Sequence, residues 1–127
     1  MSIERISTAA APAPSGAYRQ AVAHGDVLYL AGQLPLDADG ALVGADVAEQ
    51  TRRTLANVEA ILQAAGSSLN RVMRATVYLA DGDDWAAMDA AFGAAFGEAL
   101  PARTTIQVGP LGMGALVEID VIAARDS

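Results

Sequence analysis

Arg103 and Glu118 are the charged residues of this sequence that are best placed to do chemistry. Arg103 opens one predicted strand, and Glu118 lies between apolar neighbours in another strand that is expected to run opposite it. A guanidinium binds a carboxylate through two parallel charge-assisted hydrogen bonds, and a carboxylate among apolar residues can orient water and move a proton. An ordinary ion pair of Arg103 with Glu118 or Asp120 would give the same arrangement of charged residues on strands. Taken alone, this arrangement favours a structural ion pair over a functional site.

Tyr18 and Gly32 could add uncharged contacts to such a site. The phenol of Tyr18 can hydrogen-bond a substrate or a water molecule, although an aromatic residue at a strand edge also packs on a core. Gly32 follows an apolar strand, where a missing side chain lets a ligand approach the backbone or simply permits a bend. The glycines at 109, 112 and 114 do not form a phosphate-binding loop, because the required spacing, lysine and following helix are missing.

Three residue types are absent or rare, and this narrows the possible chemistry. The chain has no cysteine and one histidine, so a thiol nucleophile, a disulfide and a Cys- or His-rich metal site are excluded. All eight basic residues are arginine, so no lysine can form a Schiff base with a substrate or with pyridoxal phosphate. Any catalysis must use Arg, Asp, Glu, Tyr, Thr, Ser, the backbone or water.

The charge balance argues against polyanionic partners. The formal net charge is −7, and the arginines are scattered along the sequence. Nucleic acids and anionic membranes are therefore poor partners, whereas one well-placed arginine can still bind a small anionic substrate. No apolar run reaches the ~18 residues of a membrane span, and Glu4 and Arg5 do not fit a signal peptide, so we expect a cytoplasmic protein.

The length and the pattern predict one α+β domain over residues 1–127. The order of elements is β-β-α-β-α-β-β, with two helices long enough to cover one face of a sheet. The strands are predicted at 18–22, 27–31, 72–79, 103–108 and 115–123, and the helices at 46–65 and from 83 or 84 to 96.

The helices carry clear periodic signals. Asp46 can cap the first helix with Glu49 in the reciprocal position of a capping box, and Gly66 can end it. Its apolar face is predicted to hold Thr54, Leu55, Val58, Ile61, Leu62 and Ala65. The stripe of the second helix is predicted to hold Trp85, Met88, Phe92, Ala95 and Phe96.

The two faces of the sheet are predicted from the alternation in each strand. In the 72–79 strand one face is expected to hold Met73, Ala75, Val77 and Leu79. The face without helices is expected to carry Arg74, Tyr78 in part, Arg103, Thr105, Glu118 and Asp120. This face could be solvated or could meet other subunits; Leu116 and Ile122 favour partial burial, and an alanine-rich core hints at subunit contacts.

In this order and spacing, several segments resemble the RidA/YjgF family of reactive intermediate deaminases over nearly the whole chain. The segments are 11–22 (APAPSGAYRQAV), 31–35 (AGQLP), 46–50 with 57–58 and 64–66, 101–105 (PARTT) and 114–119 (GALVEI). The resemblance implies a chorismate-mutase-like fold and a homotrimer with three clefts between subunits, the sheets facing inward. It also implies cofactor-free hydrolysis of 2-aminoacrylate, or its imine tautomer, to pyruvate and ammonia.

The resemblance also implies a role for each matching residue. Arg103 is expected to bind the substrate carboxylate, and Glu118 to position the water that attacks the imine carbon. Tyr18 is expected near the reacting nitrogen, and Gly32 is expected to offer backbone contacts. Because an iminium carbon is already electrophilic, positioning and proton transfer suffice, and neither a metal nor a cofactor is needed.

The sequence departs from the family pattern at positions that line the expected cleft. Thr105 stands where many members have cysteine, and Asp89 near where many have asparagine; we expect both to contact the substrate. Ala17 replaces a common proline and Ala31 a common serine. The carboxylate-binding arginine is intact, so an acidic substrate is expected, whereas the amine portion of the substrate is open.

Other functions remain alternatives. Some relatives are reported as ribonucleases, translation inhibitors or chaperone-like binders. The main alternative is therefore a non-catalytic binding or regulatory role. The charge and the absence of lysine speak against RNA, and amphipathic helices turned inward speak against an apolar chaperone surface. Two enzyme alternatives remain: a pathway-specific imine or enamine deaminase, and an enzyme that catalyses a chorismate-mutase-like rearrangement. The rearrangement usually needs more than one cationic side chain to bind its dicarboxylate substrate, and only Arg103 matches a motif.

Overall fold

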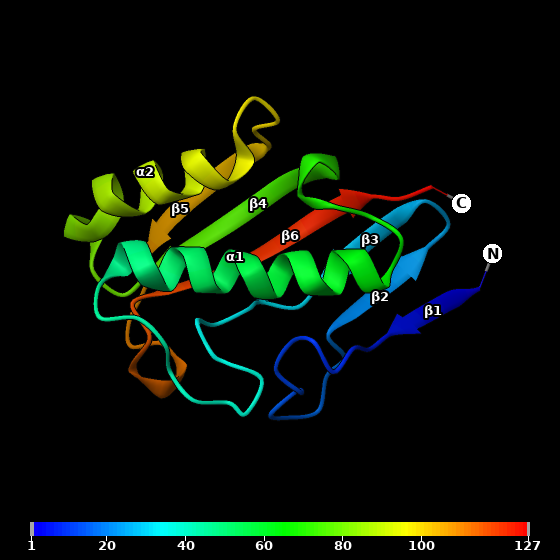
Figure 1. Ribbon diagram of the computed structural model, residues 1–127, viewed down its shortest axis with the longest axis horizontal. Coiled ribbons are helices and arrows are strands. Elements are labelled where there is room, and N and C mark those ends of the chain that lie inside the picture. The colour runs from blue at the N-terminus through cyan, green and yellow to red at the C-terminus, as the bar shows by residue number, and fades with distance from the viewer. Residues whose placement is uncertain (1, 127) are drawn as a thin grey trace.

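The computed structural model describes residues 2–126 and shows one six-stranded sheet with two α-helices on one face (Figure 1). The strand order is β1-β2-β3-β6-β4-β5, so β1 and β5 are the edges. The strands are β1 Ile3–Ile6, β2 Ala21–His24, β3 Val27–Leu30, β4 Val72–Leu79, β5 Ala102–Gln107 and β6 Val117–Ala124. The helices are α1 Val47–Ala64 and α2 Trp85–Phe96, with short 3₁₀ turns at Leu69–Arg71, Gly82–Asp84 and Gly112–Gly114.

Crossover connections put both helices on the same face. β4 and β5 pair in parallel, whereas β6 is antiparallel to both of its neighbours, β3 and β4. Parallel strands need a crossover, which α1 supplies between β3 and β4 and α2 between β4 and β5. Because such crossovers share one hand, α1 and α2 pack together over the sheet, and the predicted α+β architecture is confirmed.

The first helix follows the predicted pattern closely. All six residues predicted for its apolar face are buried. Asp46 lies just before the helix and its carboxylate accepts a 2.9 Å hydrogen bond from the Glu49 N–H. The Glu49 carboxylate accepts its return bond, 3.1 Å long, from the N–H of Ala45 rather than Asp46. The capping box is therefore present but shifted by one residue.

The second helix buries Met88, Phe92 and Phe96 as predicted, but not its other two predicted core residues. Trp85 is 47% exposed and Ala95 is exposed, whereas Ala91 is buried. Because only one side of this short helix meets the sheet, Trp85 in its first turn lies at the edge of the core.

The strands differ from the prediction in three places. β1 was not predicted, because four residues with two adjacent charged side chains, Glu4 and Arg5, show no apolar–polar alternation. The first predicted strand, 18–22, actually runs from Ala21 to His24. In β4, a bulge between Val72 and Arg74 buries Val72 and turns Met73 outward, so Met73 does not share the face of Ala75.

The most consequential correction concerns Arg103 and Thr105. β5 pairs with β4 and not with β6, and its register places Arg103 opposite Ala75 and Thr105 opposite Val77. Directly paired residues point to the same face, and Ala75 and Val77 are buried under the helices. Both residues therefore lie on the helix-covered face, not on the open face that was predicted.

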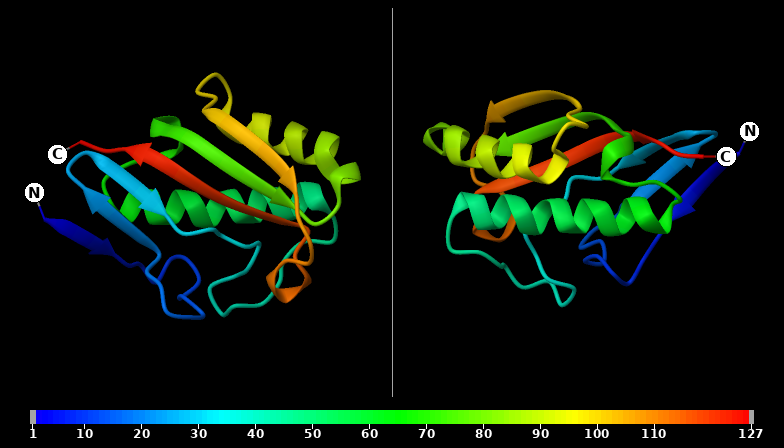
Figure 2. Two further views of the ribbon diagram at one scale, coloured as in Figure 1. Left: turned by 180° about the vertical axis from the view of Figure 1, so that it is seen from behind. Right: turned by 45° about the horizontal axis from the view of Figure 1, so that its top comes forward.

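Seen from behind, the sheet has a face that no helix covers (Figure 2, left). This open face still carries most of the polar residues predicted for it. Tyr78 is paired with Glu118, and Thr76 with Asp120, so these side chains share the face that the helices leave uncovered. Tyr29 and Ile106 are exposed apolar residues of the same face. Within residues 2–126, no helix is long and apolar enough to cross a membrane.

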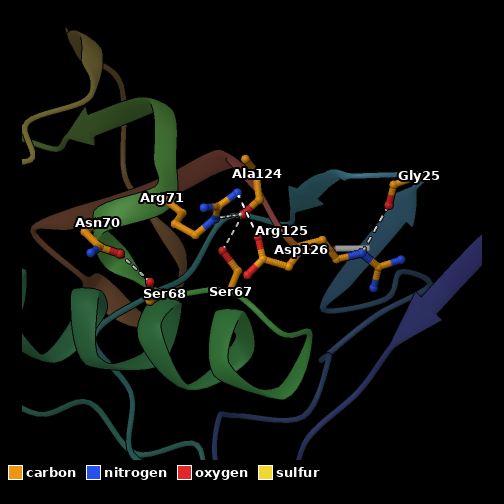
Figure 3. A network of polar contacts seen from close by, with 8 residues as sticks. All are labelled: Gly25, Ser67, Ser68, Asn70, Arg71, Ala124, Arg125 and Asp126. Carbon is orange, nitrogen blue, oxygen red and sulfur yellow. Dashed lines mark hydrogen bonds and ion pairs between the residues drawn. The ribbon is translucent and has the colours of Figure 1, made fainter.

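A polar network fixes the C-terminal end of β6 (Figure 3). The Ala124 carbonyl accepts hydrogen bonds from the Ser67 hydroxyl at 2.6 Å and from the Arg71 guanidinium at 3.4 Å. Arg125 donates to the Gly25 carbonyl at 3.1 Å and pairs with Glu4 of β1 at 3.0 Å. The strand that carries Glu118 is thus held at its far end by the segment between α1 and β4, the β2–β3 turn and β1.

Candidate functional site

Glu118 lies at a small pocket where the end of β3 meets the start of β6. The pocket has a volume of about 270 Å³ and is lined by Tyr18, Ala31, Gly32, Leu34 and Glu118. Gln33 and Ile119 exchange backbone hydrogen bonds of 2.8 and 3.0 Å, which continue the β3–β6 pairing past Leu30. This bridge places Gly32 beside Glu118.

Gly32 gives the Glu118 carboxylate its position. A Cβ atom at residue 32 would lie 2.2 Å from Glu118 Oε2, well inside contact distance. Any larger residue would therefore push the carboxylate out of place. The space beside Gly32 is thus filled by Glu118 of the same chain. Contact of a ligand with the Gly32 backbone stays a prediction.

Burial and charge both favour a proton on Glu118. Partial burial raises the pKa of Glu118 above its ordinary value, and the nearby carboxylate of Asp120 raises it further. Asp120 in turn accepts a 2.8 Å hydrogen bond from the Tyr78 hydroxyl, and this bond, burial and the two carboxylates raise the pKa of Tyr78. A carboxyl group with a raised pKa can exchange protons nearer to neutral pH.

Tyr18 lies in a loop, not in a strand as predicted, and its side chain is 47% exposed. Its hydroxyl accepts a 3.2 Å hydrogen bond from the Ser15 N–H and contacts the Ser15 hydroxyl at 3.3 Å. The ring therefore closes a short loop at the pocket mouth, with nearly half of the residue exposed.

Buried amide side chains hold the loops that form this pocket. Gln20 binds the carbonyls of Thr8 and Pro12 at 3.1 and 2.9 Å, which shapes the N-terminal loop. Asn57 of α1 donates to the carbonyls of Leu34 and Leu36 at 3.0 and 2.9 Å.

Gln50 of α1 holds the chain just before β6, two residues ahead of Glu118. Its side chain accepts a 2.8 Å hydrogen bond from the Leu116 N–H, at the entry to β6, and donates to the Gly44 carbonyl at 3.2 Å. Sequence reasoning missed the structural role of these amides. The available signal was a pair of polar residues, Gln50 and Asn57, seven positions apart on the buried face of a helix.

Arg103 lies on the other side of the sheet, at the β5 edge. Its guanidinium forms a 2.8 Å ion pair with Asp89 of α2, and its side chain is 17% exposed. The guanidinium carbon lies 4.8 Å from the centre of the Phe92 ring and 5.5 Å from that of Trp85. Stacking on two rings and pairing with a carboxylate fix its orientation.

Thr105 belongs with Arg103, because it follows two residues later on the same face. Its hydroxyl is buried and has no hydrogen-bond partner within residues 2–126. Since buried polar atoms are nearly always satisfied, a small enclosed partner such as an ordered water molecule is expected at this hydroxyl.

The structure thus brings the six predicted site residues together as two groups, not one. Glu118, Gly32 and Tyr18 line a pocket on one side of the sheet. Arg103, Thr105 and Asp89 gather on the other side, beneath α2. An ion pair of Arg103 with Glu118 or Asp120 inside one protomer, the structural alternative, is therefore wrong.

Comparison with known proteins agrees with the motifs. Residues 8–125 match the family described as Endoribonuclease L-PSP. A RutC family protein of Pyrococcus horikoshii is 45% identical over 97% of this chain and 98% of its own. The 2-iminobutanoate/2-iminopropanoate deaminase of Capra hircus is 43% identical over 94% of this chain and 88% of its own.

Solved structures give the same result. The crystal structure of the YjgF gene product of E. coli superimposes with a TM-score of 0.91 and 37% identity, covering 97% of this chain and 99% of that one. Fold, motifs and sequence identity extend over almost the whole chain, and the protein belongs to the RidA/YjgF family.

Proposed function

We propose that this protein is a cofactor-independent hydrolytic deaminase that converts 2-aminoacrylate-type enamine and imine intermediates to 2-keto acids and ammonia. The identity to a relative named as a 2-iminobutanoate/2-iminopropanoate deaminase supports this reaction. The observation that carries the proposal is Glu118, a partly buried carboxyl group with a raised pKa in a pocket beside Gly32. We also expect a cytoplasmic location.

The proposed chemistry needs only positioning and proton transfer. Arg103 binds the substrate carboxylate, and the enamine takes a proton at its terminal carbon to become the iminium ion. Glu118 accepts a proton from water as the water oxygen bonds to the iminium carbon. Glu118 returns this proton to nitrogen. As the C–N bond breaks, Glu118 takes the proton of the new hydroxyl group, so that ammonia departs, a 2-keto acid forms and Glu118 finally releases the proton to water.

We further propose that one site is shared by two protomers of a homotrimer. Arg103 and Glu118 lie on opposite faces of the sheet, and β5 is an edge strand. The open face also exposes Tyr29 and Ile106, which contact with another protomer would cover. A working site then combines Arg103 of one protomer with Glu118 of its neighbour. A stable monomer in light scattering at micromolar concentration would contradict the shared site.

The activity test couples a pyridoxal-dependent serine dehydratase to the detection of pyruvate, with and without this protein. We expect added protein to accelerate pyruvate release from the intermediate and Arg103→Ala to abolish the acceleration. No acceleration with serine or threonine as the source would reject this substrate class. A pathway-specific imine or enamine would then be tested next.

The family description makes RNA cleavage the second candidate. The net charge of −7 and the absence of lysine oppose it, because phosphate neutralisation needs clustered cations. We expect weak or absent binding of a labelled single-stranded RNA at physiological salt, and no turnover of chorismate. Tight, salt-sensitive RNA binding that survives Arg103→Ala would favour the non-catalytic binder.

A further inference from the structure

We infer that Asp89 determines which carboxylates the Arg103 group accepts, selecting those that carry an N–H donor next to the carboxylate over plain carboxylates. This inference rests on the proposed function, since it concerns the same substrate site. It identifies the preferred substrate form as the protonated imine, a zwitterion, and gives Asp89 the role of a specificity-determining residue.

The geometry shows that Arg103 is already neutralised by this chain. Asp89 Oδ1 lies 2.8 Å from one terminal nitrogen of Arg103. The contacts with Phe92 and Trp85 come from the same helix face as Asp89, so the guanidinium is held on three sides by α2. An incoming carboxylate must therefore bind beside Asp89 or displace it.

The exposure of the two partners differs in a way that favours shared binding. The Arg103 side chain is 17% exposed and that of Asp89 is 45% exposed. Asp89 thus reaches solvent while it holds the arginine, and one of its oxygens remains available for a second donor. Thr105 lies on the same face of β5, two residues from Arg103, and adds no charge to this group.

The charges then discriminate between ligands. A plain carboxylate at Arg103 places two negative groups around one cation, which weakens its binding. An iminium or ammonium nitrogen beside the carboxylate can donate to Asp89 and turn that repulsion into a charge-assisted hydrogen bond. Asparagine at this position would accept a hydrogen bond but would lack the charge that penalises plain carboxylates.

A binding experiment with two matched probes tests this role without turnover. L-alanine and L-lactate differ only in an ammonium or a hydroxyl group beside the carboxylate. Isothermal titration of the full-length protein should give at least about 10-fold tighter binding of alanine, a modest ratio because Asp89 is half-exposed and screened. Asp89→Asn should reduce this ratio about 10-fold, mainly by tightening lactate.

Three controls separate the possible failures. Asp89→Glu keeps the charge and should keep the preference for alanine. Asp83 is exposed and lies just before α2, so Asp83→Asn removes an equal charge outside the site and should leave the affinities for both probes unchanged. An unchanged ratio in Asp89→Asn, or equal weakening of both probes, would overturn the inference while leaving the proposed function standing. If neither probe binds the wild type, or if Arg103→Ala binds both as well as the wild type, the carboxylate site itself is wrong.

Discussion

The two halves of the candidate site are built by different means. The Glu118 half is shaped by backbone: a strand bridge, a glycine without a side chain, and loops held by buried amides. The Arg103 half is shaped by side chains, with one carboxylate and two aromatic rings around a guanidinium. In the Glu118 half, burial raises the pKa of the carboxyl group. In the Arg103 half, the surrounding side chains fix the orientation of the guanidinium.

This difference teaches where substitutions will be tolerated. A half that depends on backbone is disturbed when a side chain is added, because the Glu118 carboxylate must move to make room beside Gly32. A half that depends on side chains can change its ligand preference by single exchanges, as at Asp89 and Thr105. We therefore expect catalytic chemistry to depend on the Glu118 half and substrate choice on the Arg103 half.

The largest effect is expected from Arg103→Ala. Two charge-assisted hydrogen bonds to the substrate carboxylate are lost, which corresponds to a decrease in kcat/KM of about 1000-fold. The coupled pyruvate assay measures it. Arg52→Ala, which removes an exposed arginine of α1, is the matched control and should keep full activity. Equal losses in both variants would mean that the effect is not local.

Glu118→Gln should reduce kcat by at least about 100-fold with little change in KM. The amide preserves the shape of the side chain but cannot take a proton from water. Steady-state kinetics on the same substrate separates the two constants. A variant that loses only affinity would show that Glu118 binds substrate rather than activating water.

Gly32→Ala tests the backbone-built half directly and should lower kcat about 10-fold. Its methyl group would lie 2.2 Å from Glu118 Oε2 and must displace that carboxylate. Gly93→Ala is the control, because a Cβ there meets nothing within 4 Å. Wild-type kcat in Gly32→Ala would show that the position of the carboxylate is not critical.

The smallest effect is on stability, and its sign follows from the raised pKa of Glu118. A carboxyl group whose pKa is higher in the folded state binds protons more readily there, so its charged form destabilises the protein above that pKa. Glu118→Gln should therefore have a higher Tm than the wild type at pH 7.5, and the difference should shrink as the pH falls towards 4. Thermal melts at one protein concentration measure this. A Tm difference that grows on acidification would contradict the direction of the pKa shift.

The sequence was sufficient for the helices and for most of the sheet, because Leu55, Val58 and Ile61 recur with helical spacing and the later strands alternate. It also singled out the residues of both halves, through motif order. It could not assign the face of Arg103, because alternation says which residues share a face but not which strand lies beside β5. The bulge at Met73 and the amide contacts of Gln50 and Asn57 likewise depend on tertiary partners that no local pattern reveals.

The central claim is that one working site needs Arg103 and Glu118 from different protomers, and mixing two inactive variants tests it most directly. Arg103→Ala and Glu118→Gln would be unfolded, combined in equal amounts, refolded together and assayed for imine hydrolysis. In a cyclic trimer with random assembly, about one quarter of the sites would receive both intact residues, so activity should return to about one quarter of the wild type. If both residues act within one protomer, no mixed assembly contains a complete site, and the mixture would stay as inactive as either variant alone.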